Sequence, residues 1–349
     1  MAITLTSLTD LSRLRFDDII DVRSPAEYAE DHLPGAINLP VLSDAERAEV
    51  GTIYKQVSAF TARKVGGALV ARNAAGHLEG ALAEKGGGWR PLVYCWRGGQ
   101  RSGSFATILA QVGWRVELVA GGYKAWRGLV VAALEGAVPC PVVVLDGNTG
   151  SGKTDVLLRL RGLGVQVIDL EGLAGHRGSL FGAMPGGQPS QKAFEGRLAM
   201  ALAGLDPGRP VVVEAESSKV GECRVPARLW RAMVEAPRLA ILASVAARGE
   251  YLVRAYGDLT ADAGRLQGII ERLRGSHSGE VIEGWLGMAG AGDFRELAEG
   301  LMAGHYDPRY EKHRGRMGAA VVEIGADRLD EAGLDALALR VAEAVSRLG

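Results

Sequence analysis

The sequence predicts an α/β protein with two domains, each built around a parallel β-sheet. Three observations support this prediction. The chain has 349 residues, which is more than one ordinary hydrophobic core accommodates. Short apolar runs alternate with helix-like stretches, as in sheets that are covered by helices on both faces. Pro139 and Pro141 interrupt this alternation and indicate a boundary. We therefore expect a first domain at residues 1–135 and a second at residues 139–349.

Four apolar runs predict the strands of the first domain. They are FDDIID, INLPVL, RPLVYCW and WRVELVAGG, which cover residues 16–21, 37–42, 90–96 and 114–122. Helix-like stretches such as SPAEYAEDH and GSFATILAQVG lie between them. Strands that alternate with helices in this way favour a parallel sheet.

Four further runs predict the strands of the second domain. They are PVVVLD, VQVID, PVVVEAES and RLAILASV, which cover residues 141–146, 165–169, 210–217 and 238–245. After about Glu250 the pattern becomes helical, as in LQGIIERLRG and LDALALRVAEAVSRL. The second domain is therefore predicted to end in a helical part.

The composition is that of an ordinary soluble globular protein. Hydrophobic residues make up 47% of the chain and charged residues 23%. No apolar run reaches the roughly 18 residues of a membrane span. The first residues lack the basic stretch and apolar core of a secretory signal. We expect a cytoplasmic protein that does not associate with a membrane.

The formal net charge of −1 gives no support for a nucleic-acid partner. Locally, the segment from Lys219 to Arg238 is rich in arginine and includes Arg224, Arg228 and Arg231. A solvated helix face and a surface that contacts an RNA backbone both fit this pattern, and the composition leaves the choice open.

The stretch YCWRGGQRSGS places Cys95 at the end of a strand and in front of a helix. Gly98 and Gly99 let backbone N–H groups turn inward, and Arg101 and Ser102 open the helix, so that an anion nest forms. Positive dipoles in such a nest lower the thiol pKa, and the thiolate can accept sulfur or selenium or attack phosphorus. The three cysteines are too few and too widely spaced for a disulfide framework or a zinc site. We predict Cys95 and Arg101 as catalytic residues. The predicted anion-binding loop also contains Trp96, Arg97, Gly98, Gly99, Gln100 and Ser102.

The stretch GNTGSGKT satisfies the phosphate-loop pattern G-x-x-x-x-G-K-[ST] in full. It follows an apolar strand and precedes a helical stretch, which is the context that the pattern requires. Lys153 can reach outer phosphates, and the Thr154 hydroxyl can hold Mg²⁺. A nucleoside triphosphate is the default ligand, and any other diphosphate is the alternative. The predicted diphosphate-binding residues are Gly147, Asn148, Thr149, Gly150, Ser151, Gly152, Lys153 and Thr154.

A phosphate loop is commonly accompanied by an acid at the end of another core strand. Asp169 follows VQVI, and Glu214 follows PVVV, so both are candidates. A helix cap or a structural ion pair explains either residue equally well, and the sequence does not choose between them.

Two further stretches accompany the Cys95 loop. DVRSPAEYAEDHLPGAINLP, at 21–40, contains Asp-x-Arg and His-x-Pro-Gly-Ala-x-Asn, and GGYKAW lies at 121–126. Together with the Cys95 loop they resemble the rhodanese superfamily. The loop has one residue more between Cys95 and Arg101 than common sulfurtransferases of that superfamily. We expect this wider cradle to suit a tetrahedral anion better than a bare sulfane sulfur.

Four other stretches extend the likeness along the chain. They are ERAEVGTIYKQ at Glu46–Gln56, DLEGLAGHRGSLFG at Asp169–Gly182, the VEAES stretch with Glu214–Ser217, and YDPRY at Tyr306–Tyr310. With GNTGSGKT and the long Cys95 loop, residues 16–312 resemble the tRNA 2-selenouridine synthase family. This resemblance implies a rhodanese-like domain followed by a P-loop NTPase-like α/β domain. One position departs from the pattern of the family, because Ala215 occupies a position at which the family has an acidic residue.

The resemblance implies a transferase that acts on the wobble uridine of tRNA. Geranyl diphosphate, held by the phosphate loop, first alkylates the sulfur of 2-thiouridine. Selenium from selenophosphate, held by the Cys95 loop, then displaces the geranylthio group. His176, Arg177 and Ser179 are expected to contact the substrate or RNA, and Arg224, Arg228 and Arg231 to contact the RNA backbone. The sequence leaves open the oligomeric state and whether ATP is used.

Two other functions fit parts of the pattern. One is a persulfide-forming sulfurtransferase fused to an ATPase or a small-molecule kinase, which would not depend on tRNA. The other is a nucleotide-controlled binding module with an inert rhodanese-like domain. The complete set of Cys95, Gly98, Gly99 and Arg101 argues against the second, because an inert domain has no need of that thiol.

Overall fold

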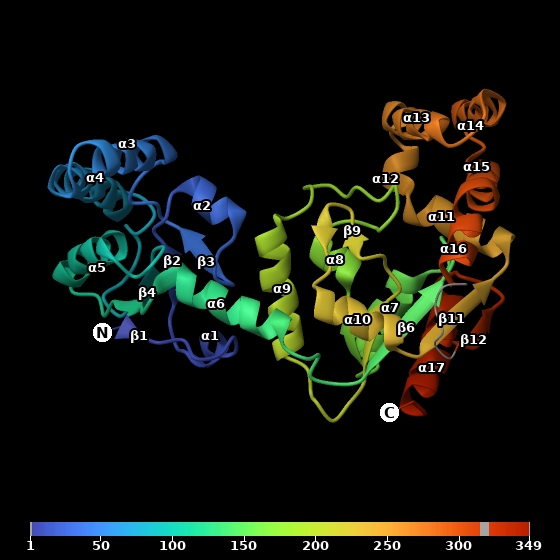
Figure 1. Ribbon diagram of the computed structural model, residues 1–349, viewed down its shortest axis with the longest axis horizontal. Coiled ribbons are helices and arrows are strands. Elements are labelled where there is room, and N and C mark those ends of the chain that lie inside the picture. The colour runs from blue at the N-terminus through green and yellow to red at the C-terminus, as the bar shows by residue number, and fades with distance from the viewer. Residues whose placement is uncertain (1, 315–320, 349) are drawn as a thin grey trace. The chain divides into compact units, whose positions relative to one another are not determined.

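The computed structural model describes residues 2–314 and 321–348. The chain divides into two compact units (Figure 1). The first comprises Met1–Gly136 together with Pro189–Gly204, and the second comprises Ala137–Gln188 together with Leu205–Gly349. The sequence predicted Pro189–Gly204 within the second domain. The structure instead packs its helix, α9 (Gln191–Ala203), against α6 (Gly122–Glu135) of the first unit.

The first unit is built on a five-stranded parallel sheet with strand order β1-β5-β4-β2-β3. The strands are β1 (Ala2–Ile3), β2 (Asp18–Asp21), β3 (Ala36–Asn38), β4 (Pro91–Tyr94) and β5 (Glu117–Val119). The other helices of this unit are α1 (Asp10–Arg13), α2 (Pro25–Glu30), α3 (Asp44–Gln56), α4 (Ala59–Glu79) and α5 (Gln100–Val112). Ile20 and Val93 of the sheet pack with Phe105 and Leu109 of α5, and all four are fully buried.

Local sequence explains where two of these helices begin. Ser24 and Glu27 form a capping box at the start of α2, where Pro25 occupies the first helical position. Ser43 and Glu46 form a second capping box at the start of α3. These reciprocal hydrogen bonds satisfy N–H groups that a helix start otherwise leaves without a partner.

The second unit is built on another five-stranded parallel sheet, with strand order β12-β11-β6-β8-β7. The strands are β6 (Val142–Gly147), β7 (Gln166–Ile168), β8 (Val211–Glu214), β11 (Arg238–Ala243) and β12 (Val321–Ala326). Two short strands, β9 (Lys219–Val220) and β10 (Cys223–Arg224), pair antiparallel. The helices beside the sheets are α7 (Lys153–Gly162), α8 (Leu170–Ala174), α10 (Ala227–Glu235) and α17 (Glu331–Ser346). The five-stranded sheets of both units are parallel, as predicted.

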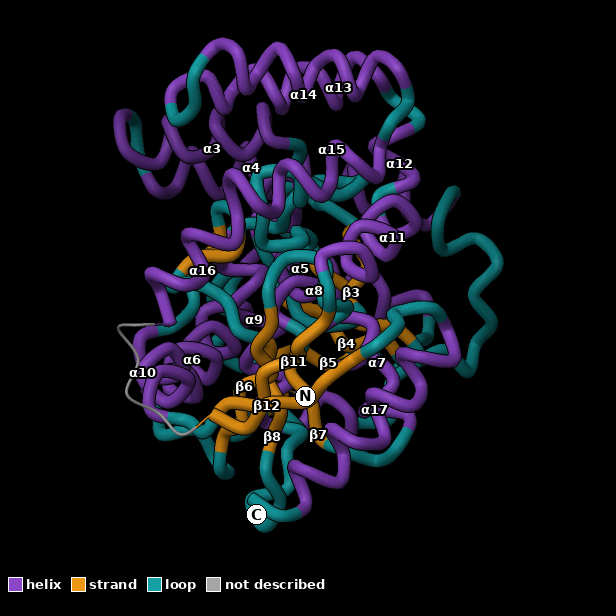
Figure 2. Tube along the Cα trace, turned by 90° about the vertical axis from the view of Figure 1, so that its right-hand side faces the viewer, coloured by secondary structure: helices purple, strands orange, loops and turns teal. Residues whose placement is uncertain are grey.

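A helical part follows β11, as the sequence predicts. It contains α11 (Val245–Ala255), α12 (Gly257–Thr260), α13 (Ala263–Glu271), α14 (Gly279–Ala291), α15 (Phe294–Leu301) and α16 (Asp307–Arg314). Its own core includes Ile270, Trp285 and Leu297. Figures 1 and 2 both show α13 and α14 at the end of this part that lies away from the unit's sheet. The strand β12, which the sequence did not predict, returns the chain to the sheet edge beside β11.

No helix among residues 2–314 and 321–348 combines the length and the apolar character that crossing a membrane requires.

Candidate functional sites

Cys95 directly follows β4 and lies at the base of a loop that leads into α5. The side chain is 3% exposed. The Gly99 N–H and the Ser102 hydroxyl donate hydrogen bonds to its Sγ, at 3.3 and 3.2 Å. The beginning of α6 braces the loop, because the Tyr123 N–H donates to the Cys95 carbonyl at 2.9 Å. The predicted nest around the thiol is therefore present.

The surroundings of Cys95 favour the thiolate. Burial raises the pKa of the thiol, but the Ser102 hydroxyl and the N–H groups of Ser102, Gly99 and Arg97 donate toward the sulfur and outweigh burial. The net result is a thiol pKa below its usual value, as the sequence predicted.

Glycine is required where α6 meets the Cys95 loop. Gly122 has φ +57°, and a Cβ on it would lie 2.2 Å from the Cys95 carbonyl oxygen. No side chain fits there, which explains the GG of GGYKAW. Trp96, beside Cys95, is half-buried, and its ring lies 5.2 Å from that of Tyr123. Arg97, Gly98, Gly99 and Gln100 form the exposed rim of the loop.

Arg101 forms an ion pair with a carboxylate. Its Nη1 donates to Glu27 Oε2 at 2.7 Å, and Arg47 Nε reaches the same oxygen at 2.9 Å. Burial raises the pKa of Glu27, but the two guanidinium groups and the Ser24 N–H outweigh burial and lower it to about 2. The carboxylate therefore stays ionised between two arginines near the Cys95 loop.

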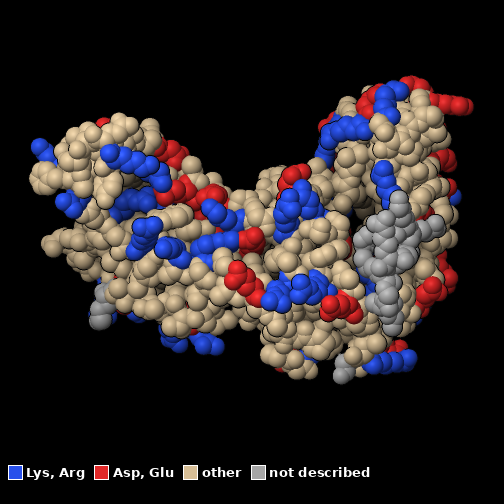
Figure 3. Space-filling view, viewed as in Figure 1, with Lys and Arg blue, Asp and Glu red and all other residues tan. Residues whose placement is uncertain are grey.

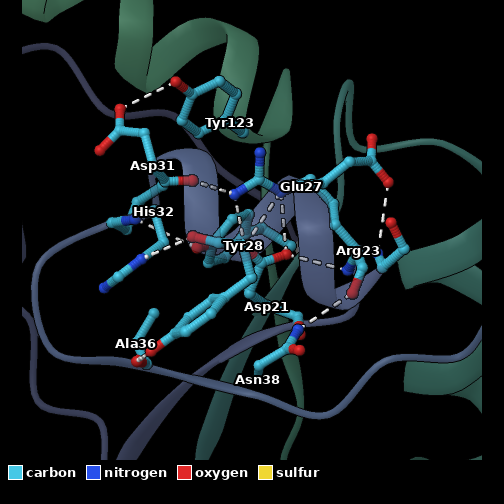
Figure 4. A network of polar contacts seen from close by, with 12 residues as sticks. Asp21, Arg23, Glu27, Tyr28, Asp31, His32, Ala36, Asn38 and Tyr123 are labelled. Carbon is cyan, nitrogen blue, oxygen red and sulfur yellow. Dashed lines mark hydrogen bonds and ion pairs between the residues drawn. The ribbon is translucent and has the colours of Figure 1, made fainter. Parts of the chain in front are cut away.

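A buried polar network holds the DVRS segment in place (Figure 4). Arg23 Nε donates to both carboxylate oxygens of Asp21, each at 3.0 Å, and Arg23 Nη2 donates to the Asp31 carbonyl. The guanidinium lies 4.1 Å from the centre of the Tyr123 ring, and the Tyr123 hydroxyl donates to Asp31 at 2.8 Å. Arg23 is 1% exposed, so its role is to fix the loops around β2 and α6.

In the second unit, β6 leads into the predicted phosphate loop, and α7 begins at Lys153. Gly150 has φ +81°, and a Cβ there would lie 2.8 Å from Leu252, so the loop turns tightly against α11. Lys153 Nζ donates to the Gly147 carbonyl at 2.8 Å, and the Thr154 hydroxyl donates to Glu171 Oε2 at 2.8 Å. Burial lowers the pKa of Lys153, but the nearby Tyr310 and acids outweigh it and raise the pKa. Lys153 therefore remains a cation inside its loop.

The two candidate acids have different surroundings. Asp169 is the N-cap of α8 and accepts a hydrogen bond from the Gly172 N–H at 2.7 Å. Glu214, at the end of β8, is fully buried and accepts from the Glu171 N–H at 2.7 Å. Burial and the charges of Asp169 and Glu171 hold the pKa of Glu214 well above its usual range. Both residues thus have structural bonds that position the segment around Glu171.

Asp169 lines the cavity at the phosphate loop, but the charges that act on Lys153 include two acids that the strand-end rule did not select, Glu171 and Glu216. Glu171 bonds Thr154, and it lines the cavity at this loop together with Arg177 and Ser179. Burial and the charge of Glu171 raise the pKa of Glu216 to about 8. Both acids fall inside stretches that carried the family resemblance, two residues beyond the acids that the strand-end rule selected. Among the described residues, no group of three or more His, Cys, Asp and Glu side chains is arranged to hold a metal ion.

A hydrogen-bond network that the sequence did not predict connects the phosphate loop to the helical part. Arg248 Nη2 pairs with Asp307 at 2.7 Å, and Arg248 Nη1 donates to the Thr149 carbonyl at 3.1 Å. Asn148 Nδ2 donates to the same Asp307 at 3.0 Å. This network explains the YDPRY stretch, because its aspartate bonds Asn148 directly and holds Arg248, which bonds the Thr149 carbonyl. The ring centre of its last tyrosine lies 5.6 Å from Lys153 Nζ.

The residues of the HRGS segment, at 176–179, have different surroundings. Arg177 donates to Asp258 at 3.1 and 3.2 Å and lies over the Tyr256 ring. His176 Nδ1 accepts from the Gly178 N–H, and burial lowers the pKa of the imidazole. Arg177 and Ser179 line the cavity of about 390 Å³ at the phosphate loop, whereas His176 is not among its lining residues.

An apolar cavity adjoins the cavity at the phosphate loop. The two share Thr149, Ser179, Leu252 and Tyr256 as lining residues. The remaining lining of the apolar cavity comes from Phe181, from side chains of α11, α12, α13 and α15, and from the segment directly after α15. Examples are Leu259, Leu297, Leu301 and Met302. A ligand with a charged end and a hydrocarbon end can therefore place the first at the loop and the second among these side chains.

The arginines of the basic segment lie on the surface. Arg224 is on β10, and Arg228 and Arg231 share one exposed face of α10, whose other face buries Leu229 and Met233. Figure 3 shows Lys and Arg side chains over this helix. The exposed basic face fits either interpretation of the segment, so RNA contact stays a prediction.

Comparison with known proteins gives matches in both units. A model described as a rhodanese-like domain matches residues 5–129, and one described as the tRNA 2-selenouridine synthase AAA domain matches residues 140–276. The tRNA 2-selenouridine synthase of Pseudomonas syringae pv. syringae (strain B728a) is 35% identical over 359 residues, which cover 92% of this chain and 95% of that protein. That of Bordetella bronchiseptica (strain ATCC BAA-588 / NCTC 13252 / RB50) is 37% identical and covers 88% and 91%. That of Aeromonas salmonicida (strain A449) is 40% identical and covers 71% and 67%.

Proposed function

The chain belongs to the tRNA 2-selenouridine synthase family, and from this premise we propose that it converts 2-thiouridine of tRNA to 2-selenouridine in two steps. The first step uses geranyl diphosphate at the phosphate loop. The second uses selenophosphate at the Cys95 loop. The site of action is the wobble uridine, and the enzyme works in the cytoplasm.

In the first step, the thione sulfur attacks C1 of geranyl diphosphate. The S–C bond forms, the C–O bond breaks, diphosphate leaves, and the uridine N3 proton passes to water. Negative charge develops on the leaving diphosphate. Lys153 and the backbone N–H groups of the phosphate loop stabilise this charge, and such donors contribute about 10²–10³ in rate each. Mg²⁺, when bound with the diphosphate, would take the Thr154 hydroxyl and Glu171 as ligands and neutralise phosphate charge.

The apolar cavity beside the phosphate loop is the observation that carries this proposal. A nucleoside triphosphate would present a polar sugar and base to the side chains around the loop, whereas a prenyl diphosphate presents a hydrocarbon chain. Leu259, Leu297 and Leu301 offer such a chain an apolar lining. The cavity measures about 80 Å³, which is less than a ten-carbon chain fills. The chain therefore enters as flexible side chains such as Met302 move aside.

In the second step, selenium of selenophosphate attacks C2 of the S-geranylated base. The C–Se bond forms, the C–S bond breaks, and geranylthiol leaves with a proton. Water then cleaves the Se–P bond, which releases phosphate and restores the proton on N3. The alkylated sulfur leaves more readily than a thione, which explains why alkylation comes first. The anionic donor is held by the N–H groups of the Cys95 loop and by Arg101, which must exchange its bond with Glu27 for the selenophosphate.

A direct test is mass spectrometry of 2-thiouridine-containing tRNA after incubation with the purified protein. Geranyl diphosphate alone should give the geranylthio nucleoside, and addition of selenophosphate should give 2-selenouridine. If the folded protein leaves the tRNA unchanged but hydrolyses nucleotides, the proposal is wrong and the sulfurtransferase–ATPase alternative takes its place.

A further inference from the structure

The first unit has a large groove beside the Cys95 loop, and Arg101 is the one residue of its lining that the two-step reaction uses. It measures about 1010 Å³, and nearly all of its lining residues belong to helices α3, α4 and α5. α3 and α4 pack side by side (Figure 1). α5 contributes Gln100, Arg101 and Ser104 to the lining, so the groove reaches the loop that carries the thiol. A cavity of this volume is far larger than a selenophosphate ion needs.

The charged side chains that line the groove are all positive. Its lining contains four cations, Arg47, Lys55, Arg63 and Arg101, and none of its described lining residues is acidic. Glu27 pairs with Arg47 and Arg101, which leaves Lys55 and Arg63 as exposed charges on α3 and α4. A protein with a net charge of −1 thus concentrates positive charge in one concave surface.

Apolar side chains accompany these cations. Tyr54 lines the groove and is 62% exposed, and Phe60, in the first turn of α4, is 70% exposed. Large aromatic side chains at such exposure are typical of surfaces that bind a partner. Basic and aromatic side chains together suit single-stranded RNA, because phosphates pair with the cations and unpaired bases stack on the rings.

We propose that this groove binds unpaired nucleotides of the tRNA anticodon loop and so presents the modified base to the Cys95 loop. Lys55 and Arg63 contact the RNA backbone, and Tyr54 stacks on a base. The inference rests on the proposed function for its choice of RNA.

The test compares two double variants of the full chain. Lys55→Glu with Arg63→Glu changes groove residues, whereas Lys64→Glu with Arg72→Glu makes the same charge change at exposed positions of α4 outside the groove lining. Binding of an anticodon stem-loop RNA that contains 2-thiouridine is measured by fluorescence anisotropy over a range of salt concentrations. The groove variant should bind at least about tenfold more weakly, and its salt slope should fall by about 1.4, or about 0.7 for each lost phosphate contact. The control should stay within about threefold of wild type.

Two further measurements complete the test. Tyr54→Ala should weaken binding about tenfold and Tyr54→Phe should not, because stacking needs the ring and not the hydroxyl. Hydrogen exchange of the wild-type protein should show that the amides of α3 and α4 exchange more slowly when the RNA is bound. This measurement does not depend on whether a variant folds. Equal binding by the two double variants, together with unprotected α3 and α4, overturns the groove proposal and leaves the groove to another ligand. The activity of the wild-type protein on the same RNA tests the proposed function separately. If the protein forms the geranylthio and seleno products, the proposed function stands even when the groove proposal is wrong. If it forms neither product, the proposed function is wrong even when the groove binds the RNA.

Discussion

Arg101 and Glu27 lie 74 positions apart in the sequence, and the Nη1 of the first donates to the Oε2 of the second at 2.7 Å. Arg47 shares the same carboxylate. The guanidinium group that the sequence assigned to anion binding is therefore held in a defined position by a partly buried carboxylate. An incoming oxyanion must compete with Glu27 for it.

The first prediction concerns the stability that this pair contributes. The pKa of Glu27 is lowered to about 2, so its contribution is present above the unfolded value near 4.5 and is lost as pH falls from there toward 2. Glu27→Gln should lower the free energy of unfolding at neutral pH by about 2 kcal/mol and weaken its dependence on pH over that acid range. Urea unfolding at a series of pH values measures both effects. Glu49→Gln, at an exposed position of α3, should behave as wild type. A Glu27→Gln protein as stable as wild type would show that the ion pair does not stabilise the unit.

The second prediction concerns the Cys95 thiolate. The Ser102 hydroxyl is the largest influence that lowers the thiol pKa against burial. Ser102→Ala should therefore raise the pKa of Cys95, because burial then acts with less opposition. The ultraviolet absorbance of the thiolate, followed against pH and corrected with a Cys95→Ala protein, gives the midpoint. An unchanged midpoint would mean that the backbone N–H groups alone set the pKa.

The third prediction concerns Glu216, whose pKa is raised to about 8 by burial and by Glu171. A buried acid with a raised pKa binds a proton more tightly in the folded than in the unfolded protein. Stability should then fall as pH rises from about 4.5 through about 8. Glu216→Gln, which resembles the protonated form, should remove much of this fall and melt at a higher temperature than wild type at about pH 9. Thermal melting across this range tests it, and Glu222→Gln, at an exposed position, should melt as wild type does at every pH.

The fourth prediction concerns the apolar cavity. Dimethylallyl diphosphate has five carbons fewer than geranyl diphosphate, and each buried CH₂ contributes about 0.8 kcal/mol. Its kcat/KM in the alkylation step should be lower by about 10²–10³. Ala298→Leu, in the lining of the cavity, should selectively impair use of the geranyl donor, while Ala291→Leu, exposed on α14, should have no effect. Equal use of both donors by the wild-type protein would place the hydrocarbon chain elsewhere.

Local patterns predicted much of the fold and the positions of both loops. The Cys95 and Gly147–Thr154 segments are continuous in sequence, and their glycine spacing follows directly from the turns that they make. The parallel character of both sheets followed from the alternation of strands and helices. The strand β12 was missed because it lies between helical segments and only Ile324 and Ala326 are buried.

The sequence did not predict contacts that depend on distant pairs. Arg248 and Asp307 meet across 59 positions, and Asp307 reaches Asn148 across 159. The expectation of an acid at a strand end selected Asp169, which is the N-cap of α8 in the structure. It did not select Glu171, which accepts the hydrogen bond from Thr154. The difference of two positions follows from where β7 stops and α8 begins, which periodicity does not fix. The placement of α9 with the first unit also depends on tertiary packing alone.

We propose that one chain performs two separable transfers at two different loops. Mass spectrometry of tRNA treated with wild type, Lys153→Ala and Arg101→Ala proteins, each supplied with geranyl diphosphate and selenophosphate, tests this most directly. Lys153→Ala should lose about 10²–10³ in geranyl transfer but should still selenate tRNA that was geranylated beforehand. Arg101→Ala should accumulate the geranylthio nucleoside and form 2-selenouridine about 10–10²-fold more slowly, because Arg101 holds the anionic selenium donor. If both variants lose the same step, or if Arg101→Ala selenates at the wild-type rate, the assignment of one step to each loop is wrong.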